Sequence, residues 1–154
     1  YPDLIKIPTA INYIEPTVFS KNKDFLLAGC SSLKGKLIGR VRGVKYAELC
    51  TQGMQNVAIF SDSRNLMKSL SKNIVDYSIT AHFNGLVQLK KLNVNSIIAL
   101  NPPLGKRLLF HYLHKKNKDL IPKLESIISA MAMTGELELI RQQQIIKILS
   151  QTNK

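Results

Sequence analysis

The stretch Ile38–Cys50, IGRVRGVKYAELC, combines cations and turn residues in a pattern that suits anion binding. A short apolar run ends at Arg42-Gly43, and a helix-like pattern follows directly. A helix that begins this soon after a strand offers unpaired backbone N–H groups, which attract anions. The plainer interpretation is that Gly43 only makes the turn and that both cations are solvated. The residues we expect to contact a ligand here are Arg42, Gly43, Val44, Lys45 and Tyr46.

Two further turns carry polar residues directly after strand-like segments. One is Ser61-Asp62-Ser63 and the other is Ala81-His82. Serine and aspartate are N-cap residues first and ligand donors second, so we expect Ser61 or Ser63 to cap a helix. Histidine at a strand end can bind a ligand or respond to pH, although an exposed loop histidine is the plainer alternative. We count Ser61, Ala81 and His82 with the candidate ligand-binding positions.

No arrangement of residues in the sequence is typical of an enzyme. The acids in the predicted strand-to-helix loops are Asp62 and Asp76, and no nucleophile–base–acid trio accompanies them. G-x-S-x-G, P-loop and G-x-G-x-x-G patterns are missing. His111, His114 and Asp119 lack a recognisable metal-ligand spacing. We therefore expect no catalytic residue, no metal site and no cofactor.

Composition narrows the class of protein further. The chain has 154 residues, of which 45% are hydrophobic, enough for one ordinary domain or two small lobes. No run approaches the roughly 20 apolar residues of a membrane span. The net charge is +12, but the cations are scattered and aromatics are sparse, so we expect no nucleic-acid partner. An anionic ligand and a basic surface both remain open, as do a disulfide and two buried thiols for Cys30 and Cys50.

Strand-like and helix-like segments alternate through the middle of the chain. The predicted strands are 36–41, 56–60, 75–80 and 96–100, and the predicted helices are 44–54, 61–73 and 82–92. This alternation predicts an α/β fold with a mixed, mostly parallel sheet flanked by helices on both faces. Ligands bind beyond the carboxyl ends of the strands in such sheets, where the three turns lie. The residues predicted to face inward from the first two helices are Tyr46, Leu49, Cys50, Met54, Leu66, Met67 and Leu70.

The two ends of the chain have a different pattern. LIKIP, PTVFS and LLFHYL read as strands, with Pro8 and Pro16 favouring edges or connections. The segments 119–135 and 136–151 read as helices, and Gly135 stops the first of them. The residues Leu120, Leu124, Ile127, Ile128 and Met131 share one face of the first helix. An exposed stripe of Leu120, Leu124, Ile127 and Met131 would require a partner.

The ending LHKKNKDLIPKLESIISAMAMTGELELI resembles the tail of the family 3 solute-binding proteins, which are type II periplasmic binding proteins that often serve amino-acid ABC transporters. KLIGRVRGVKYAE is similar to the strand-turn-helix of that family, and 66–76 is similar to its element that ends in an aspartate, here Asp76. The residues of the tail that match in order are Asp119, Leu120, Met131, Gly135, Leu137 and Ile140.

The resemblance implies two α/β lobes with a ligand between them. On this basis 1–20 would be a lobe-one remnant with the first crossing, 21–100 a complete second lobe, and 101–154 the return crossing with C-terminal helices of an incomplete first lobe. It implies a periplasmic or extracytoplasmic protein that binds a small polar solute for uptake, with membrane permease subunits or a sensor protein as partners. The hinge would involve Pro16, Phe19, Ile98 and Pro103.

Two departures from the family pattern bear on the ligand. The small hydroxyl residue of the first turn is missing, since Val44, Lys45 and Tyr46 follow Gly43. Ala81 stands where the family commonly has an acid that holds the ligand ammonium, and an unpaired buried ammonium costs several kcal/mol. These departures favour a neutral or anionic ligand. They also favour the alternative of a sensor or scaffold domain with a degenerate site and a protein partner.

Overall fold

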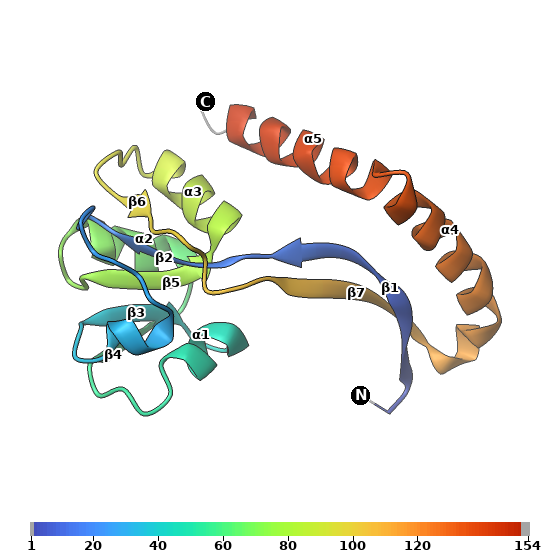
Figure 1. Ribbon diagram of the computed structural model, residues 1–154, viewed down its shortest axis with the longest axis horizontal. Coiled ribbons are helices and arrows are strands. Elements are labelled where there is room, and N and C mark those ends of the chain that lie inside the picture. Colours follow the sequence, from blue (N-terminus) through green and yellow to red (C-terminus); the bar gives the residue numbers. More distant parts are fainter. Residues whose placement is uncertain (1, 152–154) are drawn as a thin grey trace. The chain divides into compact units, whose positions relative to one another are not determined.

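The computed structural model describes residues 2–151, which divide into two compact units. Unit 1 combines the N-terminal residues up to Ile14 with Arg107–Ile148, and unit 2 combines Glu15–Lys106 with the residues from Leu149 onward. Figure 1 shows the chain with its elements labelled. None of its helices in the described range is long and apolar enough to cross a membrane.

Unit 2 is built on a five-stranded mixed sheet with the order β4-β3-β5-β2-β6. Strand β3 runs parallel to β4 and β5, whereas β2 runs antiparallel to β5 and β6. The predicted mixed α/β sheet is confirmed, with a smaller parallel share than the alternation suggested. Its strands are β2 (Pro16–Ser20), β3 (Ile38–Val41), β4 (Val57–Phe60), β5 (Tyr77–Ala81) and β6 (Ile98–Ala99).

Helices cover both faces of this sheet, as expected. The alternation of strand side chains sends Val18 to one face and Phe19 to the other. Val18 belongs to an apolar cluster with Ile38 and residues of α1 (Lys45–Cys50). Phe19 belongs to a second cluster with residues of α2 (Ser63–Ser71) and α3 (His82–Lys91). The two clusters are the core that holds the strand ends in place.

The inward faces of the helices follow the predictions only in part. Leu66, Met67 and Leu70 of α2 are buried, as predicted. In α1 the prediction for Leu49 was wrong, because its side chain is 66% exposed while Ala47 and Cys50 face the core. A helix of six residues has too few turns for its apolar face to be fixed by period alone.

Cys30 and Cys50 form a disulfide, which settles the alternative that the sequence left open. Cys30 begins a short 3-10 helix (Cys30–Leu33), and Cys50 is the last residue of α1. The bond therefore ties the loop that precedes β3 to the helix that follows it.

Unit 1 contains a two-stranded antiparallel sheet, a 3-10 helix (Lys115–Leu120) and two α-helices. Strand β1 (Leu4–Ile14) pairs with β7 (Arg107–His114), with register shifts on either side of Ala10. Helix α4 (Ile121–Met133) packs on β1, where the Glu125 carboxylate accepts hydrogen bonds from the backbone N–H of Thr9 at 3.0 Å and from its hydroxyl at 2.5 Å.

The end of α4 agrees with the sequence, whereas its apolar face agrees only in part. Gly135, with φ at 78°, separates α4 from α5 (Glu136–Gln151), so the predicted stop is confirmed. Ile128 is buried, while Leu120 and Ile127 are exposed.

Candidate functional site

The carboxyl ends of β3, β4 and β5 lie at one edge of the sheet of unit 2, because these three neighbouring strands are parallel. The turn 42–46 follows β3, Ser61-Asp62 follows β4, and Ala81-His82 closes β5 and opens α3. The predicted positions on three separate segments therefore meet at this edge, which we call the carboxyl edge.

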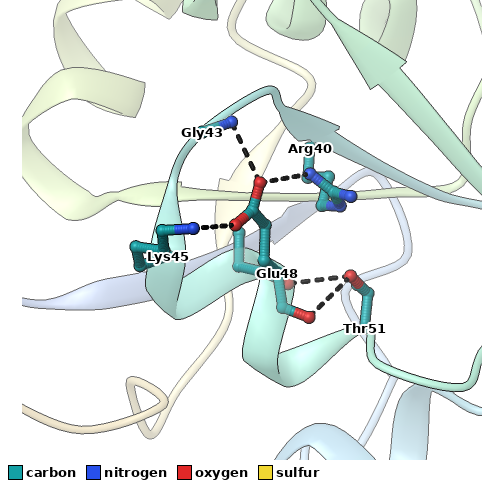
Figure 2. A network of polar contacts seen from close by, with 6 residues as sticks. Arg40, Gly43, Lys45, Glu48 and Thr51 are labelled. Carbon is teal, nitrogen blue, oxygen red and sulfur yellow. Dashed lines mark hydrogen bonds and ion pairs between the residues drawn. The ribbon is translucent and has the colours of Figure 1, made fainter.

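A carboxylate of the chain itself occupies the turn after β3. The backbone N–H of Gly43 donates to Oε1 of Glu48 at 3.1 Å, and Nη1 of Arg40 approaches the same oxygen at 3.4 Å. Nζ of Lys45 lies 3.1 Å from the other oxygen, Oε2. Figure 2 shows the three donors converging on the one carboxylate. The anion site expected from the sequence is thus already filled by Glu48.

The surroundings of Glu48 stabilise its charged form. The hydrogen bond from Lys45 is the main cause that lowers the pKa of this carboxyl, with further contributions from the N–H of Gly43 and the charge of Arg40. Sequence reasoning named Gly43 and Lys45 but missed Arg40 and Glu48. The available signal was a glutamate three residues after Lys45, in a helix whose N-cap, Val44, has no polar side chain.

The guanidinium of Arg40 is only partly used by this contact. Its side chain is 15% exposed, and its buried Nε has no hydrogen-bond partner among the residues that the structure describes. Arg42, by contrast, is an exposed residue whose backbone N–H donates to the carbonyl of Phe60 at 2.9 Å, fixing the turn beside β4.

Tyr46 connects the turn to the end of β5. Burial raises the pKa of its phenol, and hydrogen bonds with the side chain of Thr80 and the backbone of Ala81 act in the opposite direction. The phenol of Tyr46 therefore lies near Ala81, another predicted position. The methyl side chain of Ala81 supplies no charge there.

At the start of α2, as in the turn after β3, a carboxylate of the chain accepts a hydrogen bond from the backbone. Asp62, rather than Ser61 or Ser63, is its N-cap, and Oδ1 of Asp62 accepts a hydrogen bond from the backbone N–H of Asn65 at 2.8 Å. That bond is the main cause that lowers the pKa of the Asp62 carboxyl. The hydroxyl of Ser61 donates to Oδ2 of Asp62 at 2.8 Å, so it supports the cap.

The first turn of α3 lies beside that of α2. Nδ2 of Asn84 donates to the hydroxyl of Ser63 at 2.8 Å, which joins the two helix starts. The imidazole of His82 is half-buried and stacks on Phe19, with ring centroids 6.2 Å apart, while its backbone N–H donates to the carbonyl of Glu15 at 2.8 Å. The predicted position His82 is thus partly engaged in packing.

The expected hinge positions differ in their surroundings. Pro16 and Phe19 are buried in β2, and Ile98 lies in β6, where it pairs with Ser20 of β2. Pro16, Phe19 and Ile98 therefore lie inside the sheet of unit 2. Pro103 lies in the exposed loop before β7. The boundaries between the two units fall at Ile14/Glu15, Lys106/Arg107 and Ile148/Leu149.

The opposite edge of the same sheet has a polar hollow of about 260 Å³. Lys21, Lys36 and Asp76 are among the residues that line it. Asp76 forms hydrogen bonds through its backbone, since its carbonyl accepts from the Ser20 hydroxyl at 3.0 Å and its N–H donates to the carbonyl of Leu37 at 2.9 Å. Nowhere within residues 2–151 do three His, Cys, Asp or Glu side chains gather closely enough to hold a metal ion.

Comparison with known proteins identifies the fold but no family. No family model matches the chain, and no curated protein does. Among solved structures, the amino acid ABC transporter substrate-binding protein AbpA from Streptococcus pneumoniae, bound to L-arginine, matches with a TM-score of 0.70 at 14% identity, over 99% of this chain and 64% of that chain. The GluR0 ligand-binding core with L-glutamate matches at 0.68 and 12% identity, over 100% and 66%.

A sensor domain gives a similar result. A histidine kinase sensor domain with similarity to periplasmic binding proteins matches with a TM-score of 0.69 at 15% identity, over 91% of this chain and 62% of that chain. The chain therefore spans less than two thirds of the length of these structures. Its mixed α/β architecture is the fold of periplasmic-binding-protein-like domains.

Proposed function

We propose that this chain is part of an extracytoplasmic solute-binding protein that holds a small polar ligand at the carboxyl edge of unit 2. The observation that carries the proposal is the meeting of three polar turns at that edge, in a fold whose solved neighbours include proteins bound to L-arginine and L-glutamate. Ligands of open α/β sheets bind beyond the carboxyl ends of the strands, which is where these turns lie.

The ligand we propose is neutral or anionic rather than an ordinary amino acid. Ala81 offers no carboxylate to an ammonium group, while Arg42 and Lys45 are exposed cations next to the same edge. An ammonium buried without a partner would cost several kcal/mol, whereas a polar neutral or anionic group would meet donors. The residues proposed to line the site are Arg42, Gly43, Val44, Lys45, Tyr46, Ser61, Ala81 and His82.

An uptake role extends the proposal to partners and location. One neighbour is a substrate-binding protein of an ABC transporter, so membrane permease subunits are the proposed partners. The Cys30–Cys50 disulfide supports a periplasmic or other extracytoplasmic location, because disulfides persist in oxidising compartments. Unit 2 is the proposed second lobe, and the proposed hinge lies at the unit boundaries, close to Pro16 and Pro103.

The proposal is tested by a thermal-shift screen against amino acids, organic acids and phosphorylated compounds, followed by titration calorimetry of each hit. Ligands that bind the native state raise the melting temperature. For an anionic hit we expect Arg42→Gln to weaken binding by about tenfold, which corresponds to roughly 1.4 kcal/mol. The matched control is Arg107→Gln, an exposed arginine in β7 of unit 1. If the two variants bind the ligand with equal affinity, the ligand does not bind at the carboxyl edge.

The second candidate is a sensor or scaffold domain of the same fold with a degenerate site and a protein partner. The occupation of the first turn by Glu48 and the similarity to a histidine kinase sensor domain favour it. This candidate would be supported over transport if no solute in the screen raised the melting temperature and the chain formed a stoichiometric complex with a signalling protein.

A further inference from the structure

We propose that Glu48 is a tethered competitor that occupies the anion subsite of the carboxyl edge, so that a ligand anion binds there only by displacing it. The inference rests on the proposed binding of a solute at this edge and adds a residue that determines its specificity. A ligand group that is neutral at the turn leaves Glu48 in place, whereas a carboxylate or phosphate competes with it for the same donors.

The first support is the chemistry of the contact. Glu48 accepts from one backbone N–H, that of Gly43, and from two cations, Arg40 and Lys45, through both of its oxygens. These are the donor types that bind carboxylates and phosphates in proteins generally. A free carboxylate would find the same set of donors if Glu48 left them.

The second support is the local balance of charge. Arg40, Arg42 and Lys45 lie within the turn and its flanks, and Glu48 is the carboxylate that contacts Arg40 and Lys45. Removal of that charge leaves three cations near one backbone N–H, in a chain of net charge +12. The resulting positive potential attracts anions.

The third support is that the contact is weak enough to be exchanged. The distance from Arg40 to Glu48 is 3.4 Å, at the long end for a hydrogen bond, and Nε of Arg40 is left without a partner among the described residues. The Glu48 side chain is 29% exposed and Lys45 is 87% exposed, so water reaches the pair. Exposed ion pairs of this kind contribute little net free energy.

Tethering makes Glu48 an effective competitor despite this weak contact. A group held on a short flexible connection acts at an effective concentration on the order of millimolar or more. A free anion must exceed that level, or bring additional contacts, before it occupies the turn. Wild-type protein should therefore discriminate against anions that offer nothing beyond their charge.

The test compares Glu48→Gln with wild type, using sodium acetate and inorganic phosphate as probes at neutral pH and constant ionic strength. Glutamine keeps an oxygen that accepts from Gly43, so the turn remains closed while the charge is lost. The readout is the amide chemical shift of Gly43 in two-dimensional NMR spectra, which also report whether each variant is folded. We expect Glu48→Gln to lower the dissociation constant of both anions by about tenfold or more, because a neutral amide competes less strongly than a carboxylate for Arg40, Lys45 and the N–H of Gly43.

The control is Glu138→Gln, which removes the same charge from another i,i+3 ion pair, with Arg141 in unit 1. It should leave anion binding as in wild type, and Arg40→Gln added to Glu48→Gln should abolish the gain. Unchanged binding in folded Glu48→Gln, or an equal gain in Glu138→Gln, overturns the inference. If uncharged solutes bind wild type but Glu48→Gln does not change anion affinity, the inference about Glu48 is wrong while the proposed function remains. If Glu48→Gln binds anions more tightly while no solute binds wild type, the proposed function is wrong while the inference about Glu48 remains.

Discussion

Glu48 and Asp62 are two carboxylates that the chain directs at its own backbone N–H groups along the carboxyl edge. The sequence predicted where the edge lies, because turns between strands and helices have local signatures in Gly43, Ser61 and Asp62. It did not predict that Glu48 fills the first turn. A side chain of this length reaches several partners, and the choice depends on how Arg40 and Lys45 are placed in three dimensions.

The same carboxylates make stability depend on acid. The pKa values of Glu48 and Asp62 are lowered in the folded protein from ordinary values of 4.5 and 3.8. Their contribution to the free energy of unfolding is therefore present above those values and is lost as pH falls below them. We expect the urea midpoint to decline as pH drops below about 4.5, and this decline to be shallower in Asp62→Asn.

Asparagine is as good an N-cap as aspartate, so Asp62→Asn should match wild type at neutral pH. Asp24→Asn, in an exposed loop, serves as the control for the loss of one charge. A decline of equal slope in wild type and Asp62→Asn would contradict the assignment of Asp62.

At the scale of elements, the alternation of apolar runs predicted the strands and helices of unit 2, and the structure has each of them. Their order and direction in the sheet were less accessible. Strands β2 and β6 pair antiparallel with partners that are distant in the sequence, and period-2 patterns carry no information on direction. The length of α1 was also overestimated, since the predicted helix 44–54 ends at Cys50.

The Cys30–Cys50 disulfide should contribute strongly to the stability of unit 2. Its sequence separation is 20 residues, and closing a loop of this size constrains the unfolded chain by about 3 kcal/mol. We expect the double variant Cys30→Ser/Cys50→Ser to lose about this much free energy of unfolding, measured by urea denaturation. Wild type treated with a reducing agent should lose a similar amount of free energy of unfolding. Equal stability of the oxidised and reduced forms would exclude this role.

Helix α3 rests on the sheet through a glycine. A Cβ at Gly85 would overlap the ring of Phe19, which is fully buried. Alanine gains about 1 kcal/mol of helix propensity over glycine. Overpacking costs roughly 1–3 kcal/mol. We expect the clash to outweigh the gain in helix propensity, so that Gly85→Ala lowers the free energy of unfolding by up to about 2 kcal/mol.

The comparison for this substitution is Gln88→Ala in the same helix, a half-buried position where alanine has no such neighbour to displace. Its unfolding curve should lie close to that of wild type. A stabilised Gly85→Ala would mean that the ring of Phe19 can give way.

At the scale of the whole molecule, the two units differ in how much apolar surface they bury. Among the described residues, the buried hydrophobic side chains of unit 1 are Ile7 and Ile128, and the others belong to unit 2. Unit 1 instead exposes many large apolar side chains on both of its strands and both of its helices. Examples are Leu4, Leu108, Tyr112, Ile127, Leu139 and Ile146. Two-stranded sheets are marginally stable on their own.

We therefore expect amide hydrogen exchange to separate the units. Amides of β2, β3 and β5 should exchange last, because they lie in the core of unit 2, and those of β1 and β7 should exchange early. Mass spectrometry of exchanged peptides measures this order. Uniform protection along the chain would indicate one cooperative body. The sequence predicted an exposed apolar stripe on the helix that became α4, and two of its residues, Leu120 and Ile127, are exposed.

The order of segments along the chain has a consequence for engineering. Unit 1 is assembled from two separate stretches, while residues 15–106 of unit 2 are continuous between them. In genetic terms residues 15–106 are an insertion between the two stretches of unit 1. They can be cloned as a single reading frame that contains the Cys30–Cys50 disulfide and the three turns of the carboxyl edge. Unit 1 has no such frame, and one cut in either connecting segment would still leave the two units joined through the other.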